Sequence, residues 1–172
     1  MAPDLRSYVR DIPDFPIPGI LFRDITPLLG NAAAFRESVE AMSRPWQDRG
    51  VDYVAAMEAR GFMFAAPMAL AMGAGFVPIR KAGKLPGPTR SVSYQLEYRD
   101  DELHIHEDAV PRGASVLVVD DVIATGGTAA AVVALIRELG GDVVGLQFLI
   151  ELTDLGGRAL LGDCEVHSVI TY

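Results

Sequence analysis

The chain has 172 residues, half of them hydrophobic, which is enough to bury one substantial core. Its formal charge of -8 argues against nonspecific binding to nucleic acid or to anionic lipid. Charged residues near the start exclude a signal peptide, and no apolar run is long enough to cross a bilayer. We therefore expect a soluble cytoplasmic protein, and the single cysteine, Cys164, fits a reducing compartment.

Strand-like apolar runs alternate with segments of helical period, a pattern typical of an α/β protein with a mostly parallel sheet. The proline-rich stretch 12–27 is expected to run extended. Asn31 can cap a helix from residue 32 towards 49, which Pro45 should kink or break. Two more helices, each followed by glycine, are expected at 62–72 and 128–139. Strands are expected at 53–57, 76–80, 115–120 and 143–150.

The charged side chains are unevenly distributed along the chain. No Asp or Glu lies between Glu58 and Glu97, whereas five basic residues do: Arg60, Arg80, Lys81, Lys84 and Arg90. The segment indicates either a local anion site or a solvated basic face. Within it, residues 81–91 mix Gly, Pro and Lys after a strand, which is typical of a mobile loop over a site. Residues 92–97 and 103–106 can then pair as an antiparallel hairpin.

The most informative stretch is SVLVVDDVIATGGT, residues 115–128. It places two acids after a buried strand, then a loop with two glycines, then a helix. Amides at a helix start can hold a phosphate, and glycines let the backbone approach it closely. The spacing fits neither a Walker A loop nor a dinucleotide-binding fingerprint.

The two acids, Asp120 and Asp121, fall where open α/β sheets bind their ligands. Carboxylates at that place can accept hydrogen bonds from sugar hydroxyls. Either feature has a structural alternative, since acids can cap a helix and a Gly-Gly pair can simply turn the chain. Together, and in this order, they predict a site for a phosphorylated ribose.

VLVVDDVIATGGT resembles the phosphoribosyl pyrophosphate motif of the type I phosphoribosyltransferases. Four further stretches, in the same order, resemble the adenine phosphoribosyltransferase family: PGILFRDITPLL, EARGFMFAAP, FVPIRKAGKLPGPT and SYQLEY. The resemblance implies one type I phosphoribosyltransferase domain over residues 1–172, with flanking helices around the sheet. It also implies a small base-binding hood from about 1–30, a flexible lid loop at about 83–99, and a homodimer.

The resemblance also implies roles for single residues. Pyrophosphate would be contacted by Arg60, with three basic residues near it: Arg80, Lys81 and Lys84. Ribose hydroxyls would bind the two aspartates, and the 5′-phosphate would bind a loop of Ala124, Thr125, Gly126, Gly127 and Thr128. Phe22 would stack on adenine, and backbone groups of Leu21 and Arg23 would read its edge. Glu97 would exchange a proton with the base.

The implied reaction forms AMP and pyrophosphate from adenine and phosphoribosyl pyrophosphate, a step of purine salvage. Mg²⁺ is expected through substrate oxygens and water rather than through direct protein ligands. A transferase for another purine base stays open, as does a noncatalytic regulator that keeps the ribose-phosphate pocket. The presence of Arg60 and Glu97 favours the enzyme. Two departures from the family pattern are Arg99, where Gly is usual, and Pro45.

Overall fold

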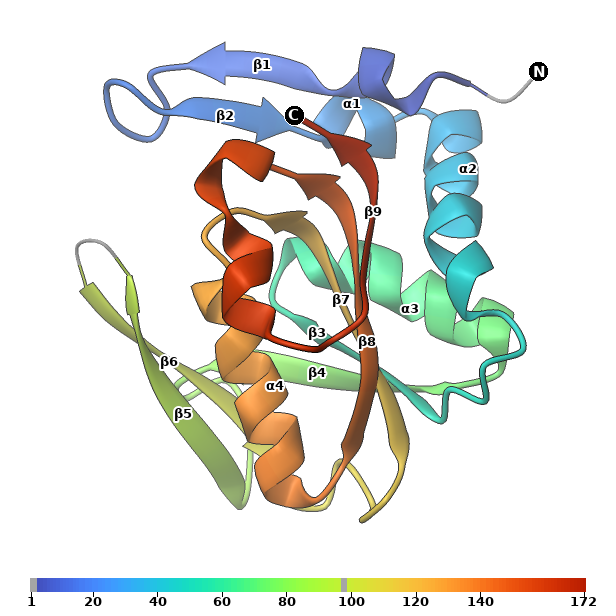
Figure 1. The fold of residues 1–172 in the computed structure, drawn as a ribbon, viewed down its shortest axis with the longest axis vertical. Coiled ribbons are helices and arrows are strands. Elements are labelled where there is room, and N and C mark those ends of the chain that lie inside the picture. Colours follow the sequence, from blue (N-terminus) through green and yellow to red (C-terminus); the bar gives the residue numbers. More distant parts are fainter. Residues whose placement is uncertain (1–2, 97–98) are drawn as a thin grey trace. The chain divides into compact units, whose positions relative to one another are not determined.

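The computed structural model describes residues 3–96 and 99–172, which belong to two units that divide between Ala41 and Met42. The first unit holds two short strands and the second a large sheet (Figure 1). Within the described part of the chain, no helix has the length and apolar character needed to span a membrane.

In the first unit, the proline-rich stretch folds back on itself. Strands β1 (Arg10–Pro13) and β2 (Leu21–Asp24) pair antiparallel around a turn at 14–20. The extended conformation predicted for 12–27 is correct for the strands. It is wrong for the turn and for Thr26 and Pro27, which begin a short helix. The chain reverses because prolines in the turn cannot donate ladder hydrogen bonds, while the Gly19 amide donates to the Asp14 carboxylate at 2.7 Å.

Helical segments flank this hairpin. They are the 3-10 helix η1 (Leu5–Tyr8), α1 (Thr26–Leu29) and α2 (Ala32–Ser43). Asn31 caps α2 as predicted, because its side chain accepts hydrogen bonds from the amides of Ala33 and Ala34. The predicted break at Pro45 is confirmed, since the 3-10 helix η2 (Arg44–Trp46) follows α2.

The second unit is built on a sheet of order β5-β6-β4-β3-β7-β8-β9. Its strands are β3 (Tyr53–Met57), β4 (Gly75–Lys81), β5 (Thr89–Leu96), β6 (Arg99–His106), β7 (Ser115–Ile123), β8 (Asp142–Glu151) and β9 (Val166–Thr171). Five neighbouring strands pair in parallel, in the order β4, β3, β7, β8 and β9. Strands β5 and β6 form an antiparallel hairpin, and β6 pairs antiparallel with β4. The α/β class, the four predicted strands and the predicted hairpin are therefore confirmed. Among the described residues of the lid predicted at about 83–99, 83–88 are irregular and β5 begins at Thr89.

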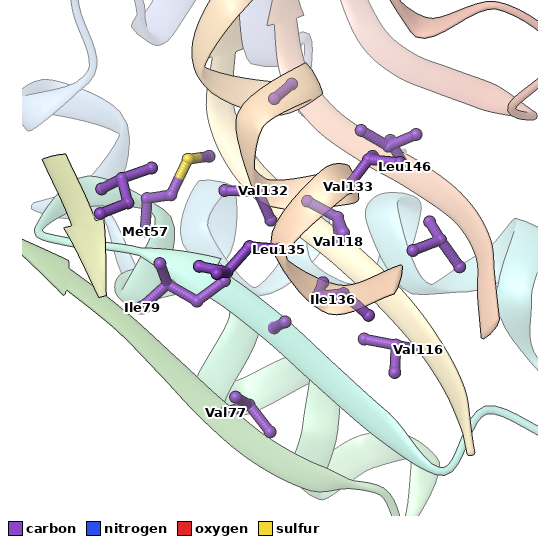
Figure 2. Close-up of a cluster of buried hydrophobic side chains, with 14 of the residues drawn as sticks. Met57, Val77, Ile79, Val116, Val118, Val132, Val133, Leu135, Ile136 and Leu146 are labelled. Carbon is purple, nitrogen blue, oxygen red and sulfur yellow. The ribbon is translucent and has the colours of Figure 1, made fainter. Parts of the chain in front are cut away.

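Two helices cover this sheet, α3 (Arg60–Met72) on one face and α4 (Gly127–Leu139) on the other (Figure 1). Both end before glycine, as predicted. Side chains alternate along β7, so Val116 and Val118 join the cluster that buries Leu135 of α4 (Figure 2). Two short helices, η3 (Thr153–Leu155) and η4 (Gly157–Leu161), connect β8 to β9. The core thus holds the end of β7 and the start of α4 in place.

Candidate active site

A cavity of about 210 Å³ opens where β7 gives way to α4. This is the carboxyl end of a central parallel strand, where α/β sheets bind ligands. Its lining includes Phe148, Arg60, the two aspartates and the loop that follows them, residues 124–128, called here the phosphate loop. The structure therefore gathers Arg60, the acids and the whole predicted phosphate loop around one space.

The acids lie inside β7, which corrects the predicted strand end at residue 120. The ladder with β8 continues past them, with Val122 opposite Ile150 and Ile123 opposite Glu151. Because β7 pairs with β8 both before and after the two acids, their backbone is more restrained than the backbone of a loop. The phosphate loop starts only after Ile123.

The acids are also electrostatically unusual. Asp121 is only 3% exposed. Burial raises the pKa of Asp121, although the Arg60 guanidinium opposes this, with its Nε 3.0 Å from Asp121 Oδ2. Burial raises the pKa of Asp120 well above its usual range, and the neighbouring Asp121 carboxylate adds to the rise. Two close carboxylates in a poorly hydrated place favour a ligand that brings hydroxyl donors or positive charge.

The phosphate loop turns sharply into α4. Gly126 has φ +84°, a left-handed conformation that suits glycine, and Gly127 is the first residue of the helix. The loop therefore precedes the positive end of a helix of 13 residues, which attracts phosphate. A Cβ on Gly126 would lie 2.2 Å from the carbonyl oxygen of Gly157. Sequence reasoning missed Gly157, and its one signal was a third Gly-Gly pair at 156–157.

Arg80 is paired with an acid outside the cavity lining. Its Nη2 donates to Glu58 Oε2 at 3.2 Å, and the Lys81 amide donates to Glu58 Oε1 at 2.6 Å. Burial alone would raise the pKa of Glu58, but these two donors outweigh it and the net pKa is lowered. Arg80 also donates to the Lys84 carbonyl at 3.2 Å, so Arg80, Lys81 and Lys84 form one cluster around Glu58.

The Lys81 side chain points to a different partner. Its Nζ lies 2.9 Å from Asp101 Oδ2 on β6, and Arg90 lies 3.2 Å from Glu107. Asp101 and Glu107 come after the acid-free segment in the sequence, and they thus neutralise part of its positive charge. Of that segment's basic residues, Arg60 lies in the cavity lining. The side chains of Arg80, Lys81 and Arg90 form ion pairs with acids outside that lining.

The predicted base-binding residues lie on β2 in the first unit. The Phe22 ring meets Phe15 edge to face, with ring centroids 5.1 Å apart. Arg23 forms an ion pair with Asp11 on β1, and Leu21 is exposed. The predicted proton-transfer residue, Glu97, lies outside the described residues.

The acids in the cavity lining, Asp120 and Asp121, are its possible metal ligands. Within residues 3–96 and 99–172, no group of three or more His, Cys, Asp or Glu is arranged to hold an ion. Asp121 Oδ2 is buried, and the Arg60 guanidinium is its ion-pair partner, with Nε 3.0 Å away. Carboxylate oxygens suit Mg²⁺, and so small a donor set fits an ion that takes its other ligands from substrate and water.

Comparison with known proteins decides the family. The sequence profile of the phosphoribosyl transferase domain matches residues 28–159. Adenine phosphoribosyltransferase of Rhodopirellula baltica is 55% identical over 98% of this chain and 82% of its own length. The chain belongs to the adenine phosphoribosyltransferase family.

Solved structures agree with that assignment. The enzyme of Thermoanaerobacter pseudethanolicus matches with a TM-score of 0.96 and 49% identity, over 98% of each chain. The Saccharomyces cerevisiae enzyme, crystallised with adenine and an imino-altritol bisphosphate, matches with a TM-score of 0.91 and 39% identity over 96% of each chain. Family membership confirms the enzyme class and the fold that the five resembling stretches predicted.

Proposed function

We propose that this member of the family forms AMP and pyrophosphate from adenine and phosphoribosyl pyrophosphate, using the residues around the cavity at the end of β7. The observation that carries the assignment is the shared lining of that cavity by the acid pair and the phosphate loop. One part offers acceptors for a diol, and the other offers amides for a phosphate. The yeast relative bound to adenine and a bisphosphate supports the same substrate pair.

Asp120 and Asp121 orient the ribose through its hydroxyls, and the amides of the phosphate loop hold the 5′-phosphate. Holding both ends of the sugar leaves its anomeric carbon at a defined position. Positioning of this kind supplies much of the rate in transfer reactions that need no covalent nucleophile. Bound hydroxyl donors would also relieve the unfavourable burial of the two carboxylates.

Departure of pyrophosphate leaves positive charge on the ribose ring and builds negative charge on the leaving group. Arg60 stabilises the leaving group from the cavity wall. Arg80 and Lys81 assist after leaving Glu58 and Asp101, and Lys84 assists beside them. Mg²⁺ would be held by pyrophosphate and ribose oxygens, near Asp120 and Asp121, where it would neutralise part of the charge.

The proposal for how the base binds rests on the family resemblance of two stretches, PGILFRDITPLL and SYQLEY. Phe22 stacks on adenine, while backbone groups of Leu21 and Arg23 distinguish its amino group from a 6-oxo group. Glu97 takes a proton from the base as a purine nitrogen bonds to the anomeric carbon and the bond to pyrophosphate breaks. The hood at about 1–30 and closure of the lid belong to this proposal.

A homodimer is part of the same proposal. Three apolar side chains on α3 and β4 are exposed in the single chain: Met63, Leu70 and Phe76. Leu70 is 84% exposed, which is unusual for a large apolar residue. Sedimentation of the wild-type chain and of Leu70→Asp tests whether this face joins two copies. The cytoplasmic location stays a prediction.

A panel of bases tests the reaction itself. Adenine, hypoxanthine, guanine and xanthine are each offered with phosphoribosyl pyrophosphate and Mg²⁺, and pyrophosphate release is measured. Adenine should exceed the 6-oxopurines by about a hundredfold or more in kcat/KM, because the reversed donor and acceptor pattern leaves buried groups unpaired. Faster release with a 6-oxopurine would assign another base. Binding of phosphoribosyl pyrophosphate without release would indicate a regulator.

A further inference from the structure

A cluster of charged and polar groups lies behind the phosphate loop and outside the cavity lining. It consists of Glu151 at the end of β8, Arg158 in η4 and Ser168 on β9, called here the brace. We propose that Arg158 and Glu151 are positioning residues that hold η4 against the phosphate loop and so set its affinity for the sugar phosphate. The inference rests on the proposed role of the loop in binding the 5′-phosphate.

Within the brace, Arg158 and Glu151 form a bidentate ion pair. Arg158 Nε donates to Glu151 Oε1 and Nη2 donates to Oε2, both at 2.6 Å, in the paired geometry that fixes both groups. Arg158 Nη1 also donates to the Val166 carbonyl at 2.7 Å, and the Ser168 hydroxyl donates to Glu151 Oε2. The Glu151 side chain is 9% exposed. One guanidinium therefore ties η4 to the ends of two strands.

The electrostatics agree with this geometry. Hydrogen bonding to Arg158 lowers the pKa of Glu151, against the effect of burial. Ion pairs with one partly exposed partner contribute little net stability, because desolvation and side-chain ordering offset the attraction. Such a pair is better suited to fixing the orientation of the segment that carries it.

That segment contacts the phosphate loop directly. Gly157, next to Arg158, has no room for a side chain, because a Cβ there would lie 2.3 Å from the Ala124 carbonyl oxygen. A Cβ on Gly126 would in turn lie 2.2 Å from the Gly157 carbonyl oxygen. The backbone of η4 is thus one wall of the loop, and a shift at Gly157 must move the loop amides.

The brace also lies beside the root of the loop. Glu151 pairs with Ile123, the last residue of β7, and the Leu152 amide donates to the Ile123 carbonyl at 3.0 Å. The far end of η4 is anchored separately, because Leu161 is buried in the main core. Loss of Arg158 should therefore release the Gly157 end of η4 and leave the fold intact.

Arg158→Ala is the first test. We expect KM for phosphoribosyl pyrophosphate and Kd for ribose 5-phosphate to rise together by about tenfold. Turnover should change by less than about threefold, because Asp120 and Asp121 still orient the ribose. KM for adenine should stay within the same range, because the proposed base-binding residues are not part of the phosphate loop. Arg158→Lys keeps the charge but not the paired donors, so its constants should fall between those of alanine and wild type. It also serves as the test variant should alanine prevent folding.

The control is Arg49→Ala, which breaks another Arg–Glu pair in the same unit. Arg49 lies 2.7 Å from Glu165, and its side chain is 46% exposed against 47% for Arg158. Neither partner lines the cavity, so we expect KM for phosphoribosyl pyrophosphate to stay at the wild-type value. Thermal melting of all three variants compares their stabilities.

Each outcome decides the proposal. Unchanged sugar-phosphate affinity in Arg158→Ala would overturn it, as would an equal loss in Arg49→Ala, which would mark a general effect of stability. If the wild-type chain itself failed to bind ribose 5-phosphate, the proposed role of the loop would fail first. A selective loss in Arg158→Ala, partly restored by lysine, supports the brace.

Discussion

The sugar-phosphate region and the hairpin region of the second unit are built in opposite ways. The first runs from β7 through the phosphate loop into α4, and the side chains of its strand and helix form much of the buried core. The second comprises the end of β4, residues 82–88 and the β5–β6 hairpin, and most side chains of 81–88 are exposed. The first region is fixed by packing. In the second, Leu103 and Ile105 of β6 also join the core, but the two basic side chains at the end of β4 are held by ion pairs.

This difference separates two tasks of the proposed reaction. The cavity proposed for sugar and phosphate is lined by β7 and α4, which the core holds in place, so binding there should cost little reorganisation. Arg80 and Lys81 are instead engaged by Glu58 and Asp101, and they must change partners to reach pyrophosphate. Substitutions in the first region should therefore act on stability and affinity together, and substitutions in the second on turnover or affinity alone.

The largest effect is expected at Glu97. Glu97→Ala should lower kcat by about two to four orders of magnitude, because the proton acceptor for the base is lost. Thermal stability should stay near the wild-type value. Steady-state kinetics and thermal melting measure the two quantities. Nearly full turnover in Glu97→Ala would remove the proton-transfer role.

Next is the turn of the phosphate loop. Gly126→Ala should raise KM for phosphoribosyl pyrophosphate by about a hundredfold and lower the free energy of unfolding by about 2–4 kcal/mol. The causes are its φ of +84° and the contact with the Gly157 carbonyl. Gly127→Ala is the control for stability, since nothing lies within 4 Å of its added Cβ. Equal unfolding midpoints in urea would contradict the packing argument.

A smaller effect is expected for the acid pair, and it should depend on pH. Asp120→Asn should lower kcat/KM by about tenfold, because a charged acceptor for a ribose hydroxyl becomes neutral. It should also raise Tm by about 2–4 °C at neutral pH.

The direction of this change in Tm follows from the raised pKa of Asp120. The folded chain binds this proton more readily than the unfolded chain, so stability is lost as pH rises through the folded pKa. Asparagine carries no charge and escapes that loss. The gain in Tm should therefore shrink as pH is lowered towards the usual aspartate range, and a gain independent of pH would refute the electrostatic cause.

The smallest effect is expected where Lys81 meets the hairpin. Asp101→Asn releases Lys81 and should lower KM for phosphoribosyl pyrophosphate by about threefold, since an ion pair with one half-exposed partner is weak. Glu107→Gln, which releases Arg90 instead, should leave KM unchanged. A rise in KM on Asp101→Asn would show that Asp101 positions Lys81 and does not compete with pyrophosphate.

Many of the helix ends could be predicted because their signals are local. The Asn31 cap in the first unit, and the break at Pro45 and the glycine ends of α3 and α4 in the second, depend on neighbouring residues along the chain. The length of β7 could not be predicted, because its last pairs are made with β8. The reversal at 14–20 was missed because the prolines there indicate extended backbone without indicating where the chain turns.

The sequence by itself determined the order of the site: strand, two acids, glycine loop, helix. Each of these choices is local, since it follows from backbone freedom, side-chain period and helix polarity. Only the tertiary structure decided what surrounds the site, namely Arg60 on its wall, Gly157 behind its loop, and the acids that hold Arg80 and Lys81. Those contacts join residues far apart in the chain, and packing of the whole sheet, which no local pattern encodes, brings them together.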